Sequence, residues 1–279
     1  MHTRIIMENH INQFLDYLLR EEKSQATQDK YIRDIRAFWR FTGSNPVTKE
    51  VVMAYKKWCI DRGYAVRSIN SMLASINSFL GFMDWYDCKV KSIRVQRQTY
   101  CAEEKELTKA EYQRLLDASR DNEQLNLLLQ TICGTGIRVS ELKYFTIEAI
   151  RHGEVSVSCK SKTRIILIPG KLQKRLLKYA GKRKIKTGIV FVGRHNKPLD
   201  RSSIWRQMKQ LCKQASVKET KVFPHNLRKL FARTFYGIEK DIAKLADILG
   251  HSSINTTRIY IMTTGSEHRK KIECLGLVV

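Results

Sequence analysis

The chain has little proline and glycine, with 4 and 14 among its 279 residues, and it contains no low-complexity tract. Collagen-like and linker-like chains are therefore excluded, and helix is favoured because these two residues are the strongest helix breakers. No window approaches 18 uncharged apolar residues, and an acid already stands at Glu8, before a signal-peptide core could be built. We expect a protein with no membrane segment that works in the cytoplasm.

Acidic residues are scarce as well. The chain has 27 Asp and Glu against 51 Lys and Arg, which gives a formal net charge of +24. A charge of this size repels itself in a compact fold, and a polyanionic partner relieves the repulsion. Nucleic acid and anionic membrane are the two candidates, and the lack of an apolar span favours nucleic acid.

Familiar metal and cofactor motifs are missing. The seven cysteines are scattered and include no Cys-x-x-Cys pair, so we predict reduced thiols that pack as small apolar residues. The sequence has no P-loop, no His-Glu-x-x-His and no zinc-ligand spacing. We therefore expect neither a metal nor a cofactor.

Apolar residues recur at helical spacing in four stretches between residues 11 and 83. The clearest of them runs from Ile69 to Met83 and carries a polar opposite face. The third stretch stops at Gly63, which suits a left-handed helix end. These patterns predict a four-helix domain over residues 1–87.

Cations on the second and fourth of these helices are candidates for binding a polyanion. Lys30, Arg33, Arg36 and Arg40 recur at intervals of 3, 3 and 4, so they lie on a face different from the apolar stripe. Arg67 lies on the polar face of the fourth helix. A solvated surface would give the same pattern, and the total charge favours contact with phosphates.

Charge replaces apolar periodicity between residues 88 and 106, which we interpret as an interdomain linker. A second domain over residues 107–279 opens with Thr108 and Glu111 at the spacing of a capping box. Residues 155–159 and 164–168 predict a strand pair joined by the turn 160–163, and residues 189–192 look like another short strand. The remaining pattern is helical, so the expected fold class is mainly α with a small antiparallel sheet.

Five residues in the second domain make poor core material and recur near helix ends. Arg138 follows a Gly-Thr-Gly turn, His225 and Arg228 are three apart at a helix start, and His251 and Tyr260 follow a Leu-Gly pair. Residues three apart on a helix point the same way, so His225 and Arg228 share a face. Each element alone is common, but the ordered set is not.

Three motifs carry a resemblance to the tyrosine recombinase (phage integrase) family. They read GTGIRVSEL over 134–142, PHNLR over 224–228 and LGHSSINTTRIY over 249–260. The resemblance covers nearly the whole chain, because the four N-terminal helices are similar to the family's core-binding (SAM-like) domain. The chain resembles short members of the family, of the Xer type or the transposon-resolvase type.

The resemblance assigns chemical roles that the residue types can fill. Breaking a phosphodiester without metal or ATP requires a nucleophile, cations for the developing charge and an acid for the leaving oxygen. Tyr260 is implied as the nucleophile that forms a 3′-phosphotyrosyl link, with Arg138 and Arg228 clasping phosphate oxygens. His225 is implied to assist proton transfer, and His251 to hydrogen-bond a phosphate oxygen.

Four further residues are interpreted through the same resemblance. The family's general acid is a lysine on the strand-pair turn, where Lys160 and Lys162 both stand; we favour Lys160, and the choice stays open. Glu141 resembles the family's acidic residue near the active site, in a supporting role. Lys229 stands where the family often has a second histidine, and we expect it to be structural. No catalytic group is lost, so an active enzyme is expected.

The implied activity is site-specific recombination of double-stranded DNA through a Holliday junction, with integration, excision, resolution or inversion as the outcome. A basic run is followed by a C-terminal tail with the apolar residues Ile272, Leu275, Leu277, Val278 and Val279. The family suggests that this tail docks on a neighbouring subunit of a homo-tetramer; packing on its own domain is the alternative. An accessory protein or a partner recombinase stays open as a further partner. Rival functions are strand relaxation like that of a type IB topoisomerase, and non-catalytic DNA binding.

Overall fold

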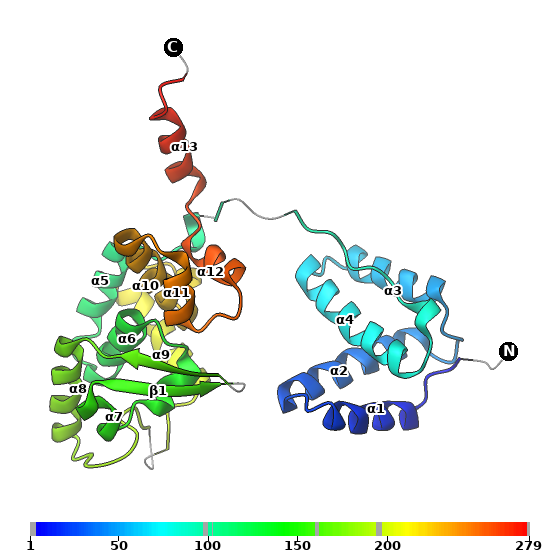
Figure 1. Ribbon diagram of the computed structural model, residues 1–279, viewed down its shortest axis with the longest axis horizontal. Coiled ribbons are helices and arrows are strands. Elements are labelled where there is room, and N and C mark those ends of the chain that lie inside the picture. Colours follow the sequence, from blue (N-terminus) through cyan, green and yellow to red (C-terminus); the bar gives the residue numbers. More distant parts are fainter. Residues whose placement is uncertain (1–3, 97–99, 102, 160–161, 194–196, 278–279) are drawn as a thin grey trace. The chain divides into compact units, whose positions relative to one another are not determined.

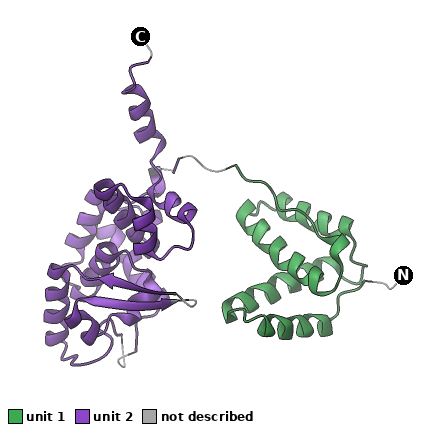
Figure 2. Ribbon diagram, viewed as in Figure 1, with its two compact units in different colours: residues 1–97 green, residues 98–279 purple. Residues whose placement is uncertain are grey.

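The computed structural model describes residues 4–96, 100–101, 103–159, 162–193 and 197–277, with the backbone alone at Glu103, Cys159 and Lys162. The chain forms two compact units, residues 1–97 and 98–279 (Figure 1, Figure 2). Within the described ranges, no helix is long and apolar enough to cross a membrane.

The N-terminal unit is built from four helices around one apolar core. They are α1 (Glu8–Arg20), α2 (Gln25–Thr42), α3 (Lys49–Asp61) and α4 (Val66–Phe82), followed by the 3-10 turn η1 (Tyr86–Cys88). Phe14, Phe38, Tyr55 and Phe79 lie fully inside the core. Gly63 follows α3 with φ +74°, as the sequence predicted for that helix end.

Two asparagines on the polar face of α4 bind the backbone of the segment that leaves the domain. Asn77 pairs its amide with both the N and the O of Val90, at 3.1 and 2.8 Å, and Asn70 does the same with Ile93, at 2.7 and 2.9 Å. Each asparagine amide thus bonds both the backbone donor and the backbone acceptor of one residue, as a neighbouring strand would do. The first part of the expected linker is therefore held on the N-terminal unit.

Lys30 is also engaged inside this unit. Its ammonium lies 2.6 Å from Asp34 Oδ2, 3.0 Å from Ser71 O and 2.9 Å from Ser75 Oγ. An ammonium has three donors, and these contacts use all of them. Lys30 therefore ties α2 to α4, whereas Arg33, its neighbour in the predicted row, has a side chain that is 72% exposed.

The C-terminal unit packs helices around a two-stranded sheet (Figure 1). Its elements in chain order are η2 (Glu103–Lys105), α5 (Lys109–Ala118), α6 (Glu123–Thr135), η3 (Val139–Tyr144), α7 (Ile147–His152), β1 (Glu154–Cys159), β2 (Lys162–Leu167), α8 (Gly170–Lys182), α9 (Arg201–Gln214), η5 (Glu219–Lys221), α10 (Pro224–Glu239), α11 (Ile242–Leu249), α12 (Ile254–Ile261) and α13 (Gly265–Glu273). The predicted capping box of Thr108 and Glu111 starts α5.

The sheet differs from the expectation in two places. The antiparallel ladder extends to the Cys159–Lys162 pair, so Lys162 and Thr163 belong to β2 and not to the turn. Residues 189–192, expected as a strand, form only isolated bridges from Ile189 to Thr146 and from Val192 to Pro198. The apolar run there has another cause, because Val190 and Phe191 are buried in the core of the unit.

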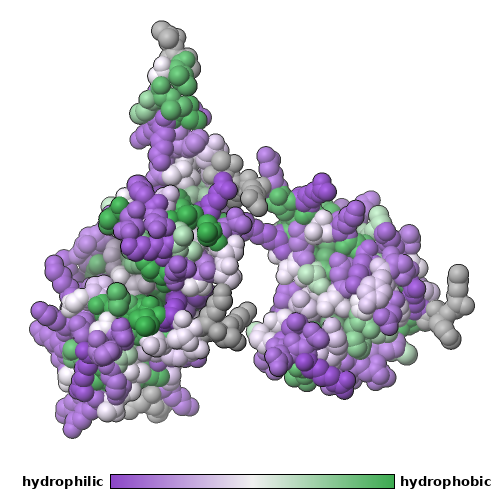
Figure 3. Space-filling model, viewed as in Figure 1, coloured by the Kyte–Doolittle hydropathy of each residue, from purple (hydrophilic) through white to green (hydrophobic). Residues whose placement is uncertain are grey.

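The last helix projects from the C-terminal unit (Figure 1). A capping box between Thr264 and Glu267 starts α13, and Arg233 of α10 holds Glu267 at 3.0 Å. Ile272 and Leu277 are 52% and 82% exposed, and apolar surface gathers at this end of the chain (Figure 3). The helix therefore leaves its apolar residues without cover from its own unit.

Candidate active site

Arg138 follows a helix end that requires glycine. After α6, Gly136 takes φ +65°, and a Cβ there would clash with the ring of Phe231. The chain then turns so that Arg138 directly precedes η3. Within η3, Glu141 accepts hydrogen bonds from the backbone N of Arg138 at 2.7 Å and from the Arg138 Nη1 at 3.0 Å. The Nη2 of Arg138 donates to Gly250 O at 3.0 Å.

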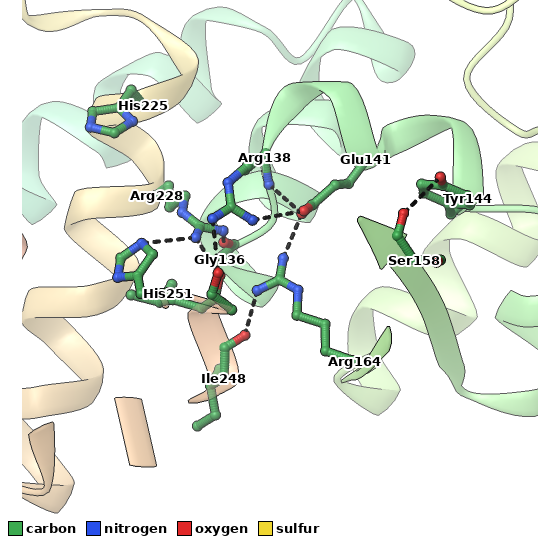
Figure 4. A network of polar contacts seen from close by, with 12 residues as sticks. Gly136, Arg138, Glu141, Tyr144, Ser158, Arg164, His225, Arg228, Ile248 and His251 are labelled. Carbon is green, nitrogen blue, oxygen red and sulfur yellow. Dashed lines mark hydrogen bonds and ion pairs between the residues drawn. The ribbon is translucent and has the colours of Figure 1, made fainter. Parts of the chain in front are cut away.

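Arg228 on α10 is a buried cation, with 1% of its surface exposed. Its Nη1 donates to Gly136 O (Figure 4). Its Nη2 donates to Leu249 O at 2.5 Å. The Nε is buried without a hydrogen-bond partner among the described residues. Burial, helped by the charge of Arg138, lowers the pKa of Arg228 to about 10, so the group stays cationic at neutral pH.

His251 is held as a neutral imidazole. Its Nε2 lies 3.1 Å from Arg228 Nη2 and its Nδ1 lies 2.8 Å from Thr257 Oγ1. A guanidinium only donates, so the Nε2 accepts and the proton is on Nδ1. Burial and the neighbouring arginines, Arg228 first, lower the pKa of His251 to about 4.

Tyr260 lies between the two histidines. Its ring centroid is 4.9 Å from that of His225 and 4.8 Å from that of His251, and its hydroxyl is 3.3 Å from His225 Nδ1. Burial lowers the pKa of His225, and the charges of Lys229 and Arg228 add to the effect. A neutral His225 can accept a proton from the phenolic hydroxyl at this distance.

A cavity of about 490 Å³ opens onto this cluster. Arg138, His225 and Arg228 line one part of it, and Trp205 and Phe223 are among the apolar residues of its wall. The cavity therefore offers cations and a histidine beside an apolar surface. In the described part of the chain, no three His, Cys, Asp or Glu side chains gather in a group that could hold a metal ion.

The structure brings together five of the six predicted catalytic residues: Arg138, His225, Arg228, His251 and Tyr260. Lys160 lies outside the described residues, and the side chain of Lys162 is not described. Lys229 has a structural contact, an ion pair with Glu106 at 3.0 Å.

Sequence reasoning missed two residues that orient the site. Thr257 bonds His251, and Arg164 of β2 reaches Glu141 at 2.5 Å. A cation directly before the apolar run 165–168 was the available signal for Arg164, and Thr257 gave none.

Two family models match this chain. A model described as Phage integrase family matches residues 105–267, more than half of the chain, and one described as Phage integrase, N-terminal SAM-like domain matches residues 11–85. The chain belongs to the phage integrase family. The resemblance carried by the three motifs is thus confirmed, and so is the mainly α fold with its SAM-like N-terminal domain.

Relatives in this family match over the whole length. Tyrosine recombinase XerA of Pyrococcus furiosus is 26% identical over 288 residues, covering 100% of this chain and 98% of that protein. Tyrosine recombinase XerD of Staphylococcus aureus is 26% identical over 287 residues, covering 95% and 97%. A solved lambda integrase tetramer bound to a Holliday junction is similar in fold, with a TM-score of 0.74 at 18% identity, over 93% of this chain and 78% of that one.

The depressed pKa of His251 predicts a loss of stability in acid. The unfolded chain binds a proton at the ordinary histidine pKa of 6.5, whereas the folded chain does not until about pH 4. The stabilisation is complete above pH 6.5 and is lost as the pH falls toward 4; it is at most about 3 kcal/mol, and solvent screening of the half-buried ring reduces it. Denaturant titrations from pH 7 to 4 should show a shallower decline for His251→Gln than for the wild type.

His152 provides the control for this measurement, because its side chain is 77% exposed. His152→Gln should follow the wild-type decline. A His251→Gln curve that is parallel to the wild type would contradict a neutral, half-buried His251.

Proposed function

We propose that this cluster cuts and rejoins DNA strands in a site-specific tyrosine recombinase. The chain is a tyrosine recombinase by family, and the proposal concerns which of its residues do the work. One observation carries it: the Tyr260 hydroxyl lies 3.3 Å from a neutral imidazole acceptor, beside the buried Arg228. This is the arrangement that an activated oxygen nucleophile requires.

Tyr260 attacks the scissile phosphorus as its proton passes to His225 Nδ1. A bond forms between the phenolic oxygen and phosphorus, and the bond from phosphorus to the 5′-oxygen breaks. The products are a 3′-phosphotyrosyl link and a 5′-hydroxyl, so the number of phosphoester bonds is unchanged. Attack by another 5′-hydroxyl reverses the step and joins a different strand, which is how exchange proceeds through a Holliday junction without ATP.

The proposed phosphate site carries an excess of positive charge. Arg138, Arg164 and Arg228 outnumber the Glu141 carboxylate, which pairs with the first two of them, so positive charge is in excess among these four groups while the histidines are neutral. We assign Arg138 and Arg228 to the non-bridging oxygens, where added negative charge develops in the transition state. Donors of this kind are worth about 3–4 kcal/mol each in comparable enzymes.

His251 reaches a phosphate oxygen as a donor only after a change in its partners. In the free protein its Nε2 accepts from Arg228, so it has no proton to give at that atom. A bound phosphate draws Arg228 away and raises the pKa of the imidazole, because the anion favours the charged form. We infer that His251 takes up a proton when the scissile phosphate binds.

Lys160 remains our candidate for the general acid that protonates the leaving 5′-oxygen. The ladder supports this choice over Lys162, because Lys162 pairs with Cys159 inside the hairpin. Lys160 is one of the two residues between the paired positions.

Four arginines of the N-terminal unit are proposed to contact DNA phosphates: Arg33, Arg36, Arg40 and Arg67. All four are exposed. Arg36 also pairs with Glu8 at 2.7 Å, an exposed ion pair that a phosphate can replace at little cost. Lys30 belonged to the same predicted row, but its three donors are already bonded, so we assign it to the contact between α2 and α4.

The projecting tail is proposed to join protomers into a tetramer on double-stranded DNA, as the tetramer of the lambda integrase neighbour suggests. Support comes from Ile272, Leu275 and Leu277, which are apolar, more than half exposed and close together in the chain. Docking on a second copy would remove that surface from water. We place this activity in the cytoplasm and leave an accessory protein or partner recombinase as a further participant.

Replacing Tyr260 tests the proposed chemistry. A duplex selected by the wild-type protein from a randomised pool, nicked near the cleavage position, should trap a covalent adduct that survives denaturing electrophoresis. Tyr260→Phe should form no adduct and bind the duplex as before, whereas Tyr236→Phe, on α10, should form it normally. Adduct formation by Tyr260→Phe would refute the assignment, and a wild type that binds but never forms an adduct would favour the non-catalytic rival.

Salt dependence separates the two kinds of cation on α2. Arg33→Met should weaken DNA binding and reduce the slope of log K against log salt by about 1. Lys30→Met should leave that slope unchanged and lower the unfolding free energy by about 2 kcal/mol, because the buried Asp34 loses its closer cation and keeps only the 3.7 Å ion pair with Arg33 and the bond from Ser75. Tryptophan fluorescence reports this unfolding, since three of the four tryptophans lie in the N-terminal unit. Equal salt slopes for Arg33→Met and the wild type would remove Arg33 from the interface.

Polar substitution of the tail tests assembly. Leu275→Ser combined with Leu277→Ser should leave binding to one half-site unchanged and weaken the cooperative binding of a second protomer by about 10- to 100-fold, since the apolar contact of two leucines is lost. Mobility shifts on duplexes with one and two half-sites measure both steps. Ile238→Ser, which changes an equally exposed residue outside the tail, is the control. Full cooperativity in the tail variant would mean that the tail packs elsewhere.

A further inference from the structure

Arg164 is a partly buried cation that the proposed chemistry does not place on the phosphate. It lies on β2, with 14% of its side chain exposed. Its Nη2 donates to Glu141 Oε2 at 2.5 Å, and its Nη1 donates to Ile248 O at 2.7 Å (Figure 4). One guanidinium therefore connects the strand, the turn η3 and the end of α11.

These contacts close a ring around Arg138. Glu141, which Arg164 holds, accepts from the backbone N and the Nη1 of Arg138. The Nη2 of Arg138 donates to Gly250 O, two residues after Ile248. Arg138 is thus held by Glu141 on one side and by the backbone at Gly250 on the other. Arg164 contacts both Glu141 and the segment that carries Gly250.

The corner before His251 is packed directly on Arg164. Gly250 takes φ +62°, and a Cβ there would lie 2.8 Å from Arg164 Cδ and 3.0 Å from its Nη1. Because Gly250 has no side chain, its backbone can lie directly against the Arg164 side chain. His251 follows at once, so its position depends on the same contact.

Arg164 also alters how strongly Glu141 holds Arg138. The carboxylate has two cations beside it, and a second cation weakens its hold on the first because the negative charge is shared. Without Arg164, Glu141 would pair with Arg138 alone, and the Arg138 guanidinium would transfer less readily to a phosphate.

We propose that Arg164 is a positioning residue for strand cleavage, which orients Arg138 through Glu141 and His251 through the Gly250 corner. The inference rests on the proposed roles of Arg138 and His251. It predicts that Arg164 affects the rate of phosphodiester cleavage and leaves the affinity for DNA almost unchanged.

Two substitutions test this role on the full chain. Arg164→Met removes both contacts and should slow covalent adduct formation on the selected nicked duplex by about 10- to 100-fold, the scale expected when reacting groups lose their alignment. Arg164→Lys keeps the charge but lacks the forked guanidinium that reaches Glu141 and Ile248 O together. Its rate of adduct formation should therefore lie between those of the wild type and Arg164→Met. Ile165→Thr, the adjacent strand residue with 57% exposure, should cleave normally.

Further readouts separate positioning from a merely structural role. The affinity for the duplex should stay within about 3-fold of the wild type, a change of less than about 1 kcal/mol. The pKa of His251, followed by NMR, should rise in Arg164→Met, because the Arg164 charge is among those that lower it. Combining Arg164→Met with Glu141→Gln should cost no more than the larger single loss, since both act through one ring.

The outcomes are distinguishable. If the wild type and Ile165→Thr form no adduct, the proposed function itself fails. If they form it and Arg164→Met or Arg164→Lys cleaves at the wild-type rate, only the positioning role fails. A slow rate matched by an equal loss of DNA affinity also overturns that role. If Arg164→Met does not fold, the rate and the His251 pKa of Arg164→Lys decide the question.

Discussion

The burial of Arg228 among backbone carbonyls is the constraint on which the site depends. Its two carbonyl acceptors, Gly136 O and Leu249 O, lie at the C-terminal ends of α6 and α11, where helices leave carbonyls unpaired and carry partial negative charge. A cation bound between two helix ends is stabilised without a carboxylate of its own. Its charge consequently remains available to a phosphate.

The same two helix ends position the other site residues. A glycine with positive φ terminates each helix, Gly136 after α6 and Gly250 after α11, and a site residue follows closely in both cases. Arg138 and His251 therefore emerge beside Arg228 because the helices that hold Arg228 stop there. Tyr260 completes the group from α12, its ring flanked by His225 and His251.

The sequence could reveal the site residues whose types are unusual for their place in a helix pattern. Arg138 and His251 closely follow glycines at helix ends, His225 and Arg228 are three apart at a helix start, and the resemblance to the family grouped these four with Tyr260. Arg164 escaped notice because a strand pattern reports which face is buried, and it does not report that a guanidinium on that strand bridges a distant carboxylate and a distant backbone carbonyl. The run 189–192 was wrongly predicted as a strand because burial and strand pairing favour the same apolar residues.

Charge periodicity has the same limit. Lys30 and Arg33 occupy neighbouring positions in one row, yet Lys30 is bonded to Asp34, Ser71 and Ser75, and Arg33 is largely exposed. The difference arises from α4, which is distant in sequence and supplies two of the three partners. A net charge of +24 therefore overstates the charge that is free to meet DNA, because some cations serve the interior. Separating the two groups requires knowing which helix packs on which.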